Sequence, residues 1–505
     1  MFSFFKKKPA TPAADAAPDA PSQAQAAEQN PAPTKQQNTR QDAVVPLSGA
    51  NVTVLGLGKS GVSAAQLLSK EGARVTVIDD NAETATDGLP PGIATCLGGA
   101  ESAVSAALEG ADLIVLSPGV PNAHPRLNAV RDKGVPIIAE VELAWQKLPK
   151  TTPLIAITGT NGKSTVTAWV GHVLEGWKPR IFAGGNLGEP LSEAVLSDTD
   201  WDVVVAELSS FQLETITSMA PTVAALLNTS PDHMDRYPNV SEYYRAKFRI
   251  FEFMDHGYAL LNEADPSTSI VTGHHLHGAA PVLFGRKESG DGVSIQDGAI
   301  ALTQGGNTHP ICPVDKIQLA GSQNLENAQA VAAICLLVGC PLPKVAEGLQ
   351  SFTGLPHRME VIASKNGVTY INDSKATNPG AVIKALLGAS GAPDADHYDE
   401  DSLTPVTLLV GGRDKGSDLF SLRQYAFQFA THVIAFGEAA ERFRIVLQGH
   451  PSVSYVDSME KAVSLAVEKT EAGGAVLLSP ACASFDEFKS FGDRGDSFRR
   501  QVEAL

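Results

Sequence analysis

The stretch AITGTNGKST, residues 156–165, constrains the possible folds of this chain more strongly than any other. The apolar run PLIAI precedes a turn that contains glycine, and KSTVTAWVGHVLEG continues with helical spacing of its apolar residues. A strand that passes through a short glycine turn into a helix opens a βαβ unit, and such units require a parallel sheet covered by helices. The chain is therefore predicted to be an α/β protein.

The turn itself has the chemistry of a phosphate-binding loop. Successive backbone N–H groups in such a turn form an anion nest, Lys163 can reach the β- and γ-phosphates of a nucleotide, and Ser164 can bind Mg²⁺. The usual pattern places a glycine where this chain has Ile157. We interpret Ile157 as a strand residue, so that a shorter loop begins at Gly159. The predicted ATP-binding residues of this loop are Gly159, Thr160, Asn161, Gly162, Lys163, Ser164 and Thr165.

The alternative is a surface turn that contains Gly-Lys-Ser by chance. The position of the turn between a buried strand and a helix argues against this alternative.

The pattern of the remaining chain predicts a tail and three α/β domains. Residues 1–45 are rich in Ala, Pro, Gln and Asn and hold few large apolar side chains, so they cannot offset their chain entropy and are expected to be disordered. A Rossmann-like domain is predicted over 46–148, a central P-loop-type ATPase domain over 149–352, and a Rossmann-like C-terminal domain over 353–505.

Each domain contains several expected elements. The first has strands in NVTVL, RVTVIDD, ADLIVLSPGV and VPIIAEVEL; the second has DVVVAELSS, TVAALLNTS and an amphipathic helix SQNLENAQAVAAICLLVG; the third has VTYINDSKA, PVTLLVGG, HVIAFG and GAVLLSPA. Residues 391–405 are expected to be an exposed acidic insertion. Ligands of open α/β sheets gather at the carboxyl ends of strands, and each motif discussed below follows a predicted strand.

Composition limits the class of partner. The net charge of −17 argues against a nucleic-acid binder, which needs a basic surface, but allows a local cluster of donors for a small anion. The five cysteines are scattered without metal-site spacing, which indicates a reduced, cytoplasmic compartment. No apolar run is long enough to span a membrane. The protein is expected to be a monomer.

The motif GLGKSG, with Gly56, Gly58 and Gly61, is followed by Asp79 at the end of the next strand. Glycines allow the backbone to approach a diphosphate at a helix N-terminus, and the carboxylate can bind a hydroxyl-bearing ligand. The motif predicts a nucleotide diphosphate site. Tight packing is the alternative, and the motif does not exclude NAD.

Two further strand ends predict the metal half of a phosphate site. Glu207 ends VVVAE and can hold Mg²⁺ against phosphate oxygens, although a strand-end carboxylate is often an ordinary surface charge. Asp232, His233 and Asp235 lie in a loop after the next strand, where a histidine binds a metal or an anion, or has a purely structural role. Nothing in the residue pattern distinguishes Lys247 from other basic residues of its short helix.

Polar clusters follow the strands of the third block. Arg358 and Lys415 can hold phosphate or carboxylate groups, and Asp373, Thr377 and Ser484 accompany them. Each of these residues, taken singly, is equally compatible with a solvated surface.

Taken together and in this order, the motifs resemble the Mur ligases of peptidoglycan synthesis. They are TGTNGKST, GGNLG, ELSSFQL, DHMDRY, YRAKFRIF, LPHRME, NDSKATNP and LLSPACASFDEF. Within that family, SSFQLE, DSKATN and SPACASFDEF are similar to the branch that adds D-glutamate. The resemblance covers about residues 48–503 and excludes the tail and the 391–405 insertion.

The resemblance implies a role for each matching residue. UDP and its diphosphate would contact Gly58, Lys59, Ser60, Asp79 and Gly119; the rest of that substrate would contact Asn186 and His233. Phosphate and the expected two Mg²⁺ ions would be held by Lys163, Ser164, Glu207, His233 and a carbamylated Lys247. Further ATP contacts would be Asn327, Arg358 and Asp373. D-glutamate would contact Thr377, Lys415, Ser484, Phe485 and Phe491. The catalytic set would be Lys163, Glu207, His233 and Lys247.

The implied activity is an ADP-forming acid–amino-acid ligase that uses ATP and Mg²⁺ to join D-glutamate to UDP-N-acetylmuramoyl-L-alanine through an acyl phosphate. Closing of the domains would exclude water from that intermediate.

Three alternatives explain fewer of the motifs. Folylpolyglutamate synthetase shares TGTNGK, but this alternative does not explain GLGKSG in a separate N-terminal nucleotide-binding domain. An NAD-dependent oxidoreductase leaves the TGTNGKST and DHMDRY loops unexplained. A non-catalytic nucleotide-binding regulator would not need Lys163, Glu207, His233 and Lys247 together.

Overall fold

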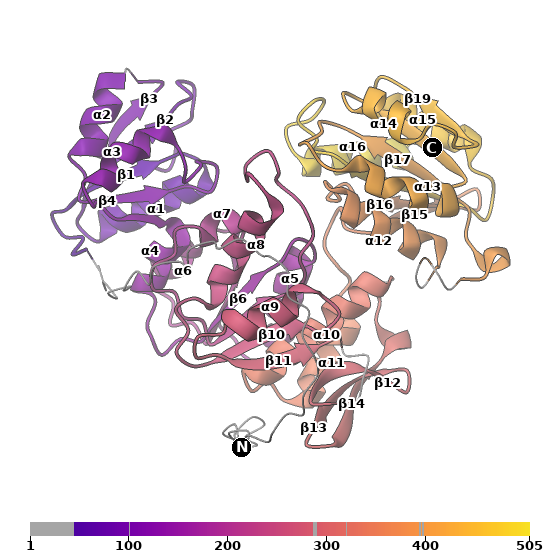
Figure 1. The fold of residues 1–505 in the computed structure, drawn as a ribbon, viewed down its shortest axis with the longest axis horizontal. Helices are drawn as coiled ribbons and strands as arrows, with labels where there is room; N and C mark the ends of the chain where they lie inside the picture. The colour runs from indigo at the N-terminus through magenta and orange to yellow at the C-terminus, as the bar shows by residue number, and fades with distance from the viewer. Residues whose placement is uncertain (1–44, 100, 286–289, 320, 393–394, 396–397) are drawn as a thin grey trace, which may run out of the picture. The chain divides into compact units, whose positions relative to one another are not determined.

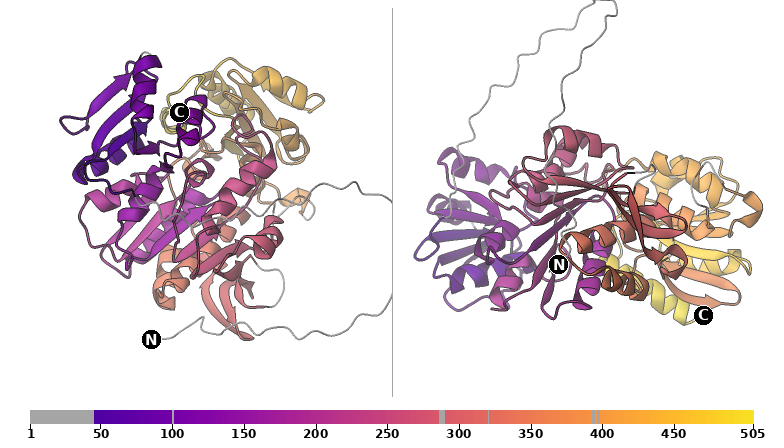
Figure 2. Two further views of the ribbon diagram at one scale, coloured as in Figure 1. Left: turned by 60° about the vertical axis from the view of Figure 1, so that its left-hand side comes forward. Right: turned by 90° about the horizontal axis from the view of Figure 1, so that it is seen from below.

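Three β-sheets follow one another along the chain, each within its own continuous stretch of residues (Figures 1 and 2). The computed structural model describes residues 45–99, 101–285, 290–319, 321–392, 395 and 398–505. The predicted disordered tail, Val45 excepted, lies outside these residues. The α/β class and the three sheet-containing parts are confirmed.

The first sheet is wholly parallel, with the strand order β3-β2-β1-β4-β5. Its strands are β1 (Asn51–Leu55), β2 (Arg74–Asp79), β3 (Ala94–Leu97), β4 (Leu113–Leu116) and β5 (Ile137–Ala139). Its helices are α1 (Lys59–Lys70), α2 (Glu101–Glu109), η1 (Pro125–Leu127), α3 (Asn128–Asp132) and α4 (Glu140–Lys147).

Strand residues alternate between the two faces of this sheet, and apolar side chains on both faces pack against helices. Val52 and Val54 pack in one apolar cluster with α1 and α4, whereas Leu55 packs in another with α2 and α3. The strand order reverses between β1 and β4. Ligands of such sheets bind at this reversal, and both GLGKSG and SPGV follow strands that flank it.

One expected strand of this domain is partly wrong. VPIIAEVEL forms a strand only over Ile137–Ala139, and Glu140 begins α4. Two acidic residues in the first turn favour a helix start, and Glu140 Oε1 accepts a hydrogen bond from Ser192 N at 2.6 Å. Val141 and Leu143 are apolar and buried, and their alternation with acidic residues resembles the pattern of a strand.

The second sheet has the order β14-β13-β12-β11-β10-β9-β6-β8-β7, parallel from β7 to β12 and antiparallel from β12 to β14. Its strands are β6 (Leu154–Thr158), β7 (Ile181–Gly185), β8 (Val203–Glu207), β9 (Val223–Leu226), β10 (Tyr258–Asn262), β11 (Ala280–Phe284), β12 (Gly292–Gln296), β13 (Ala299–Gln304) and β14 (Asn307–Pro313). Its helices are α5 (Lys163–Glu175), α6 (Leu191–Leu196), α7 (Ser210–Leu213), α8 (Val240–Phe248), η2 (Arg249–Phe251), α9 (Ser267–His274), η3 (Val314–Lys316), α10 (Ser322–Leu337) and α11 (Leu342–Ser351).

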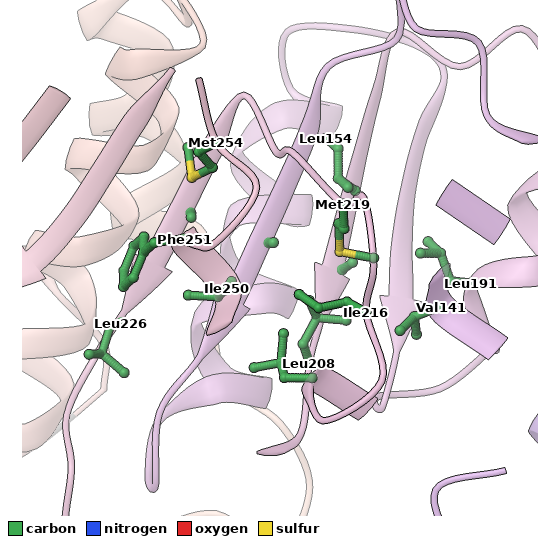
Figure 3. Packing of buried hydrophobic residues seen from close by; sticks show 14 of the residues in the cluster. Val141, Leu154, Leu191, Leu208, Ile216, Met219, Leu226, Ile250, Phe251 and Met254 are labelled. Atoms are coloured by element: carbon green, nitrogen blue, oxygen red, sulfur yellow. The ribbon is translucent and has the colours of Figure 1, made fainter. Parts of the chain in front are cut away.

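One face of this sheet is the apolar core shown in Figure 3. Leu154 and Leu226 from the strands pack there with Ile250, Phe251 and other side chains from helices and loops. The helix predicted in SQNLENAQAVAAICLLVG is confirmed as α10, but its expected amphipathic character is wrong. Every residue of α10 from Asn327 to Leu336 is buried, because other elements surround this part of the helix.

The third sheet has the order β15-β16-β20-β17-β18-β19, and only β15 pairs antiparallel to its neighbour among the described strands. Its strands are β15 (Glu360–Lys365), β16 (Val368–Asn372), β17 (Val406–Gly411), β18 (His432–Phe436), β19 (Val453–Tyr455) and β20 (Ala475–Ala481). Its helices are α12 (Pro379–Ser390), η4 (Glu400–Ser402), η5 (Leu419–Leu422), α13 (Arg423–Phe429), α14 (Ala440–Val446), α15 (Met459–Lys469) and α16 (Phe491–Glu503). Two apolar clusters cover its two faces.

The expected exposure of residues 391–405 is partly wrong. Residues 393, 394, 396 and 397 lie outside the described part, but Ala392 is buried and Tyr398 packs edge-on against Phe429 with ring centroids 4.9 Å apart. Tyr398 and Leu403 join one apolar cluster of the third sheet. The acidic residues drew attention away from these apolar anchors.

Among the residues that the structure describes, none of the helices has the length and apolarity needed to cross a lipid bilayer.

Phe251 tests the central core. It is fully buried, and Phe251→Ala is expected to lower the free energy of unfolding by about 3–5 kcal/mol because it removes apolar contact and leaves a cavity. All four tryptophans lie between residues 145 and 201, so denaturant unfolding followed by tryptophan fluorescence reports on this part of the chain. Phe420→Ala is the control: Phe420 is 56% exposed, and its loss is expected to change stability by less than about 0.5 kcal/mol. Equal effects of the two substitutions would contradict the assignment of the core.

Candidate functional site

The loop after β6 presents an uncapped helix N-terminus. Gly159 and Gly162 have φ of 154° and 84°, and Gly162 is the N-cap of α5 without any side-chain capping bond. A Cβ on Gly162 would lie 2.5 Å from Asn327 Oδ1, so glycine is required by both conformation and space. No side chain caps the first turn of α5, which leaves its N–H groups able to bind an anion.

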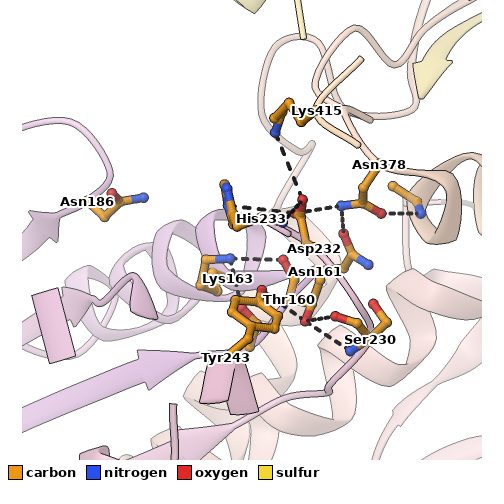
Figure 4. A network of polar contacts seen from close by, with 12 residues as sticks. Thr160, Asn161, Lys163, Asn186, Ser230, Asp232, His233, Tyr243, Asn378 and Lys415 are labelled. Atoms are coloured by element: carbon orange, nitrogen blue, oxygen red, sulfur yellow. Dashed lines mark hydrogen bonds and ion pairs between the residues drawn. The ribbon is translucent and has the colours of Figure 1, made fainter. Parts of the chain in front are cut away.

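The loop is held in place from the end of β9. Thr160 Oγ1 donates to Ser230 O at 3.0 Å and accepts from Ser230 N at 3.0 Å. Asn161 N donates to Asn228 Oδ1 at 2.8 Å, and Asn228 Nδ2 returns a bond to Asn161 O. These bonds preorganise the loop before any ligand binds; Figure 4 shows those between Thr160 and Ser230.

A cavity of about 290 Å³ lies beside this loop. It brings together all the predicted catalytic, metal and D-glutamate residues: Lys163, Ser164, Glu207, His233, Lys247, Thr377, Lys415, Ser484, Phe485 and Phe491. Four predicted ATP contacts, Thr160, Asn161, Gly162 and Arg358, and the predicted substrate contact Asn186 also line it. These residues come from the parts of the chain that hold the second and third sheets, and most of them follow the carboxyl end of a strand. Lys247 lies in α8 and Phe491 begins α16.

Two lysines that line the cavity share one hydrogen-bond acceptor. Lys163 Nζ donates to Gly159 O at 2.8 Å and Thr160 O at 2.9 Å, so here it folds back on its own loop. Lys247 is fully buried, and its Nζ donates to the same Gly159 O at 2.9 Å. Burial, and next the charge of Lys163, hold the pKa of Lys247 well below its usual value.

Glu207 provides a buried carboxylate with one free oxygen. Its Oε1 accepts from Asn186 Nδ2 at 2.8 Å, whereas its Oε2 is buried without a hydrogen-bond partner among the described residues. Mg²⁺ is commonly bound by one or two carboxylates together with phosphate oxygens and water, and Ser164 lines the same cavity. Glu207 and Ser164 therefore fit such an ion, although the described residues hold no group of three His, Cys, Asp or Glu arranged as a ready-made metal site.

His233 is neutral at physiological pH. Burial, together with nearby lysines and despite the adjacent Asp232, lowers the pKa of His233 to about 4. Its φ of 57° is unusual for a residue other than glycine, and its N–H donates to Asp232 Oδ1 at 2.8 Å. This strained turn aims the imidazole into the cavity, where a neutral ring can act as a ligand.

Asp232 connects a loop after β9 with residues that follow β16 and β17. Asn378 Nδ2 donates to Asp232 Oδ2 at 3.3 Å and to Asn161 Oδ1 at 3.2 Å, and Lys415 Nζ lies 3.9 Å from Asp232 Oδ1 (Figure 4). These contacts connect the phosphate-type loop with two predicted D-glutamate loops, those of Thr377 and Lys415.

A second cavity also borders the loop. It is lined by the predicted ATP contacts Asn161, Gly162, Thr165, Asn327, Arg358 and Asp373. Burial raises the pKa of Asp373 to about 7, and its Oδ2 accepts from Ser479 Oγ at 2.9 Å. Burial, and next the neighbouring Arg358, lowers the pKa of Lys375 to about 7.

The first sheet has a separate cavity of about 440 Å³. It is lined by the five predicted UDP contacts Gly58, Lys59, Ser60, Asp79 and Gly119. Gly61 is required for packing, because its Cβ would lie 1.9 Å from Gly56 O.

Asp79 supports the glycine loop. Its oxygens accept hydrogen bonds from Leu57 N at 2.7 Å and Asn81 N at 3.0 Å. Burial alone would raise the pKa of Asp79, but these bonds outweigh it and lower the pKa. Lys59 Nζ donates to Gly188 O and Glu189 Oε1 in the second part of the chain.

Several residues that line the main cavity were not among the predicted site residues: Phe211, Asp232, Tyr243, Lys375 and Asn378. Asn378 could have been found from the pair Asn-Pro, since it is the N-cap of α12 with proline at the first helical position. Asp232 and Lys375 were visible as polar strand-end residues. Phe211 and Tyr243 carry no comparable signal, because aromatic residues in short helices most often belong to a core.

Comparison with known proteins addresses the family. Residues 50–139 match the N-terminal domain of MurD-like Mur ligases, residues 157–335 the Mur ligase middle domain, and residues 357–482 the glutamate ligase domain of Mur ligases. The UDP-N-acetylmuramoylalanine–D-glutamate ligase of Geobacter metallireducens is 40% identical over 465 residues, which cover 91% of this chain and 98% of the relative.

Solved structures show a similar fold. UDP-N-acetylmuramate–alanine ligase MurC from Thermotoga maritima has a TM-score of 0.56 at 20% identity, covering 90% of this chain and 99% of that one. MurF ligase from Thermotoga maritima, solved in complex with ADP, has a TM-score of 0.54 at 16% identity, covering 90% and 96%. The arrangement of loops at the strand ends and these similarities lead to one conclusion: the chain belongs to the Mur ligase family.

Proposed function

We propose that this protein is an ATP-dependent ligase that adds D-glutamate to UDP-N-acetylmuramoyl-L-alanine in the synthesis of peptidoglycan precursors. The similarity to D-glutamate ligases over 91% of the chain supports this activity. The observation that carries the proposal is the charge of the main cavity. Five basic side chains line it and only two carboxylates among the described residues do, Glu207 and Asp232.

Unbalanced positive charge in a buried site is costly unless an anion neutralises it. The basic residues are Lys163, Lys247, Arg358, Lys375 and Lys415, and burial lowers the pKa of the first four. A polyphosphate would restore the balance and allow these groups to remain protonated. The uncapped N-terminus of α5 also favours an anionic ligand, and the related MurF was solved in complex with ADP. We therefore assign ATP to the loop Gly159–Thr165 and to Asn327, Arg358 and Asp373.

The reaction has two balanced steps. A carboxylate oxygen of the L-alanyl group attacks the γ-phosphorus of ATP, the bond to the bridging oxygen breaks, and an acyl phosphate and ADP form. The amine of D-glutamate then attacks the acyl carbon and loses a proton, and inorganic phosphate leaves with the C–O bond electrons. Lys163 and the N–H groups of α5 stabilise the charge that develops on the transferred group.

Glu207, Ser164 and His233 would hold Mg²⁺, with two ions proposed. Mg²⁺ supplies charge neutralisation and alignment of the phosphates. Lys247 is proposed to be carbamylated: its neutral amine attacks CO₂ and releases a proton, and the resulting carbamate offers a carboxylate to the second ion. Its lowered pKa and its burial beside Lys163 support this modification.

The substrates would occupy separate parts of the molecule. We assign the UDP group to the cavity of the first sheet, and the muramoyl end to Asn186 and His233. D-glutamate is assigned to Thr377, Lys415, Ser484, Phe485 and Phe491. The proposed domains are 46–148, 149–352 and 353–505. The enzyme is proposed to act as a cytoplasmic monomer without nucleic acid, which agrees with its five free cysteines and its acidic composition.

A coupled assay of ADP release tests the activity. With ATP, Mg²⁺ and UDP-N-acetylmuramoyl-L-alanine, sustained ADP formation is expected only when D-glutamate is added. Lys163→Ala is expected to lower kcat/KM by about a hundredfold or more, because it removes charge stabilisation from the transition state. ADP formation that does not depend on D-glutamate, or no ADP formation at all, would refute the proposed ligase activity. Full activity of Lys163→Ala would refute the assigned role of the loop lysine.

Lys247 allows a chemical rescue. Lys247→Ala is expected to lose most activity, and short-chain carboxylic acids such as acetate are expected to restore part of it by supplying the missing carboxylate. In the wild-type protein, ¹³CO₂ is expected to give a carbamate signal in ¹³C NMR that Lys247→Ala lacks. A variant whose activity does not rise with added acid, in a protein without that signal, argues against carbamylation.

The pKa of Lys375 predicts a pH dependence. As pH rises through about 7, Lys375 of the free protein loses its proton, so the affinity for ATP is expected to fall, by about fivefold or more between pH 7 and pH 8.5. Lys375→Arg keeps the charge throughout, so its affinity for ATP is expected to fall by a clearly smaller factor over the same pH range than that of the wild-type protein. Calorimetric titration with a non-hydrolysable ATP analogue measures both proteins, and the ionisation of the ligand cancels in the comparison. Identical pH profiles would show that Lys375 does not contact the nucleotide.

A further inference from the structure

Arg236 links the loop of His233 to the cavity of the first sheet, and none of the functions assigned above uses it. Its Nη1 donates to Pro118 O at 2.9 Å and its Nη2 donates to Val120 O at 3.0 Å. Both carbonyls belong to the SPGV loop after β4, which lines the cavity assigned to UDP. The guanidinium thus holds two points of one loop with a planar fork, a geometry that lysine cannot reproduce.

The other contacts of Arg236 lead into the main cavity. Its backbone N–H donates to His233 O at 3.0 Å, so both residues belong to the same turn. Its guanidinium carbon lies 3.8 Å from the ring centre of Phe211. Phe211 in turn packs edge-on against His233, with ring centroids 4.9 Å apart, and lines the main cavity. One side chain therefore touches elements of both cavities.

The SPGV loop is a β-turn whose central peptide has two possible orientations. Val120 N donates to Ser117 O at 3.0 Å, which places Pro118 and Gly119 in the middle of the turn. A glycine at the third position permits a type II turn, in which φ is positive and the central peptide is flipped by about 180° relative to type I. Gly119 does not have a positive φ here. The bond from Arg236 to Pro118 O therefore holds the peptide in one of two accessible orientations.

The orientation of this peptide matters for the nucleotide. In a trans peptide the C=O and the following N–H point in opposite directions, and the described chain has no cis peptide bonds. With Pro118 O directed at Arg236, the N–H of Gly119 is directed away from Arg236. Gly119 lines the UDP cavity, where backbone N–H groups are typical phosphate donors.

We propose that Arg236 is a positioning residue, which sets the orientation of the Pro118–Gly119 peptide in the UDP cavity and ties it to the turn that carries His233. The role rests on the proposed function, because it presumes that the first cavity binds UDP. The substrate must extend from one cavity to the other, and Arg236 holds the two loops at the spacing that it spans.

The KM values of Arg236→Ala test the proposal. The KM for UDP-N-acetylmuramoyl-L-alanine is expected to rise by about tenfold or more, while the KM values for ATP and D-glutamate change by less than about twofold. Arg236→Lys is expected to fall between, since it keeps the charge and loses the fork. If Arg236→Ala does not fold, Arg236→Lys carries the test.

Arg249→Ala is the matched control. Arg249 also donates to two backbone carbonyls, Leu213 O at 2.8 Å and Ile216 O at 2.7 Å, but both lie in the central part of the chain. It is expected to lower thermal stability and leave every KM within about twofold. Arg236→Ala with unchanged KM for the UDP substrate, or with equal increases for all three substrates, would overturn the positioning role.

Calorimetric titration with UDP alone separates this inference from the proposed function. Wild-type protein that does not bind UDP would refute the assignment of the first cavity. Wild-type protein that binds UDP, with Arg236→Ala binding it equally well, would refute the role of Arg236 and leave the ligase proposal intact.

Discussion

An excess of buried positive charge around the N-terminus of α5 is the constraint on which the rest of this structure depends. The chain as a whole carries −17, yet one cavity is lined by five basic side chains and two carboxylates. Taking these cations out of water is unfavourable, as the lowered pKa values of Lys163 and Lys247 indicate. The carbonyl oxygens of Gly159 and Thr160 hold Lys163 and Lys247 in place. Hydrogen bonds of Thr160 and Asn161 fix the loop that carries these carbonyls.

Arg494 is another buried cation, and it connects two loops beside the third sheet. It is fully buried and donates to Ser374 Oγ at 3.0 Å and Ser374 O at 2.9 Å. It also donates to Cys482 O and Ala483 O. The guanidinium thus ties together the two loops that contribute Thr377 and Ser484 to the main cavity. Neutral carbonyl and hydroxyl oxygens satisfy its N–H groups, so the arginine holds the loops without placing another carboxylate beside the main cavity.

The local sequence pattern was sufficient to predict most of the helices and strands. It was misleading where a segment is buried by residues that are distant in the sequence. The strands before each motif were predictable, because an apolar run that enters a glycine turn has few other solutions. VPIIAEVEL was wrong after Ala139, since apolar residues of a short buried helix look like a strand. The burial of α10 on all sides and the packing of Tyr398 on Phe429 depend on neighbours that the sequence does not place.

The sequence by itself determined the class of the fold, the phosphate-type loop from Gly159 to Thr165, and the strand-end positions of Glu207, His233 and Lys415, because these follow from local spacing. The importance of Lys247 came from family resemblance alone. Only the tertiary structure decided that Lys247 and Lys163 share Gly159 O, that Asp232 joins Asn378 and Lys415, and that Arg236 reaches the SPGV loop. Apart from the local bond of Lys163 to Gly159 O, those contacts join residues between 88 and 183 positions apart. The distance between such residues is set by the packing of whole sheets and helices, which no local pattern encodes.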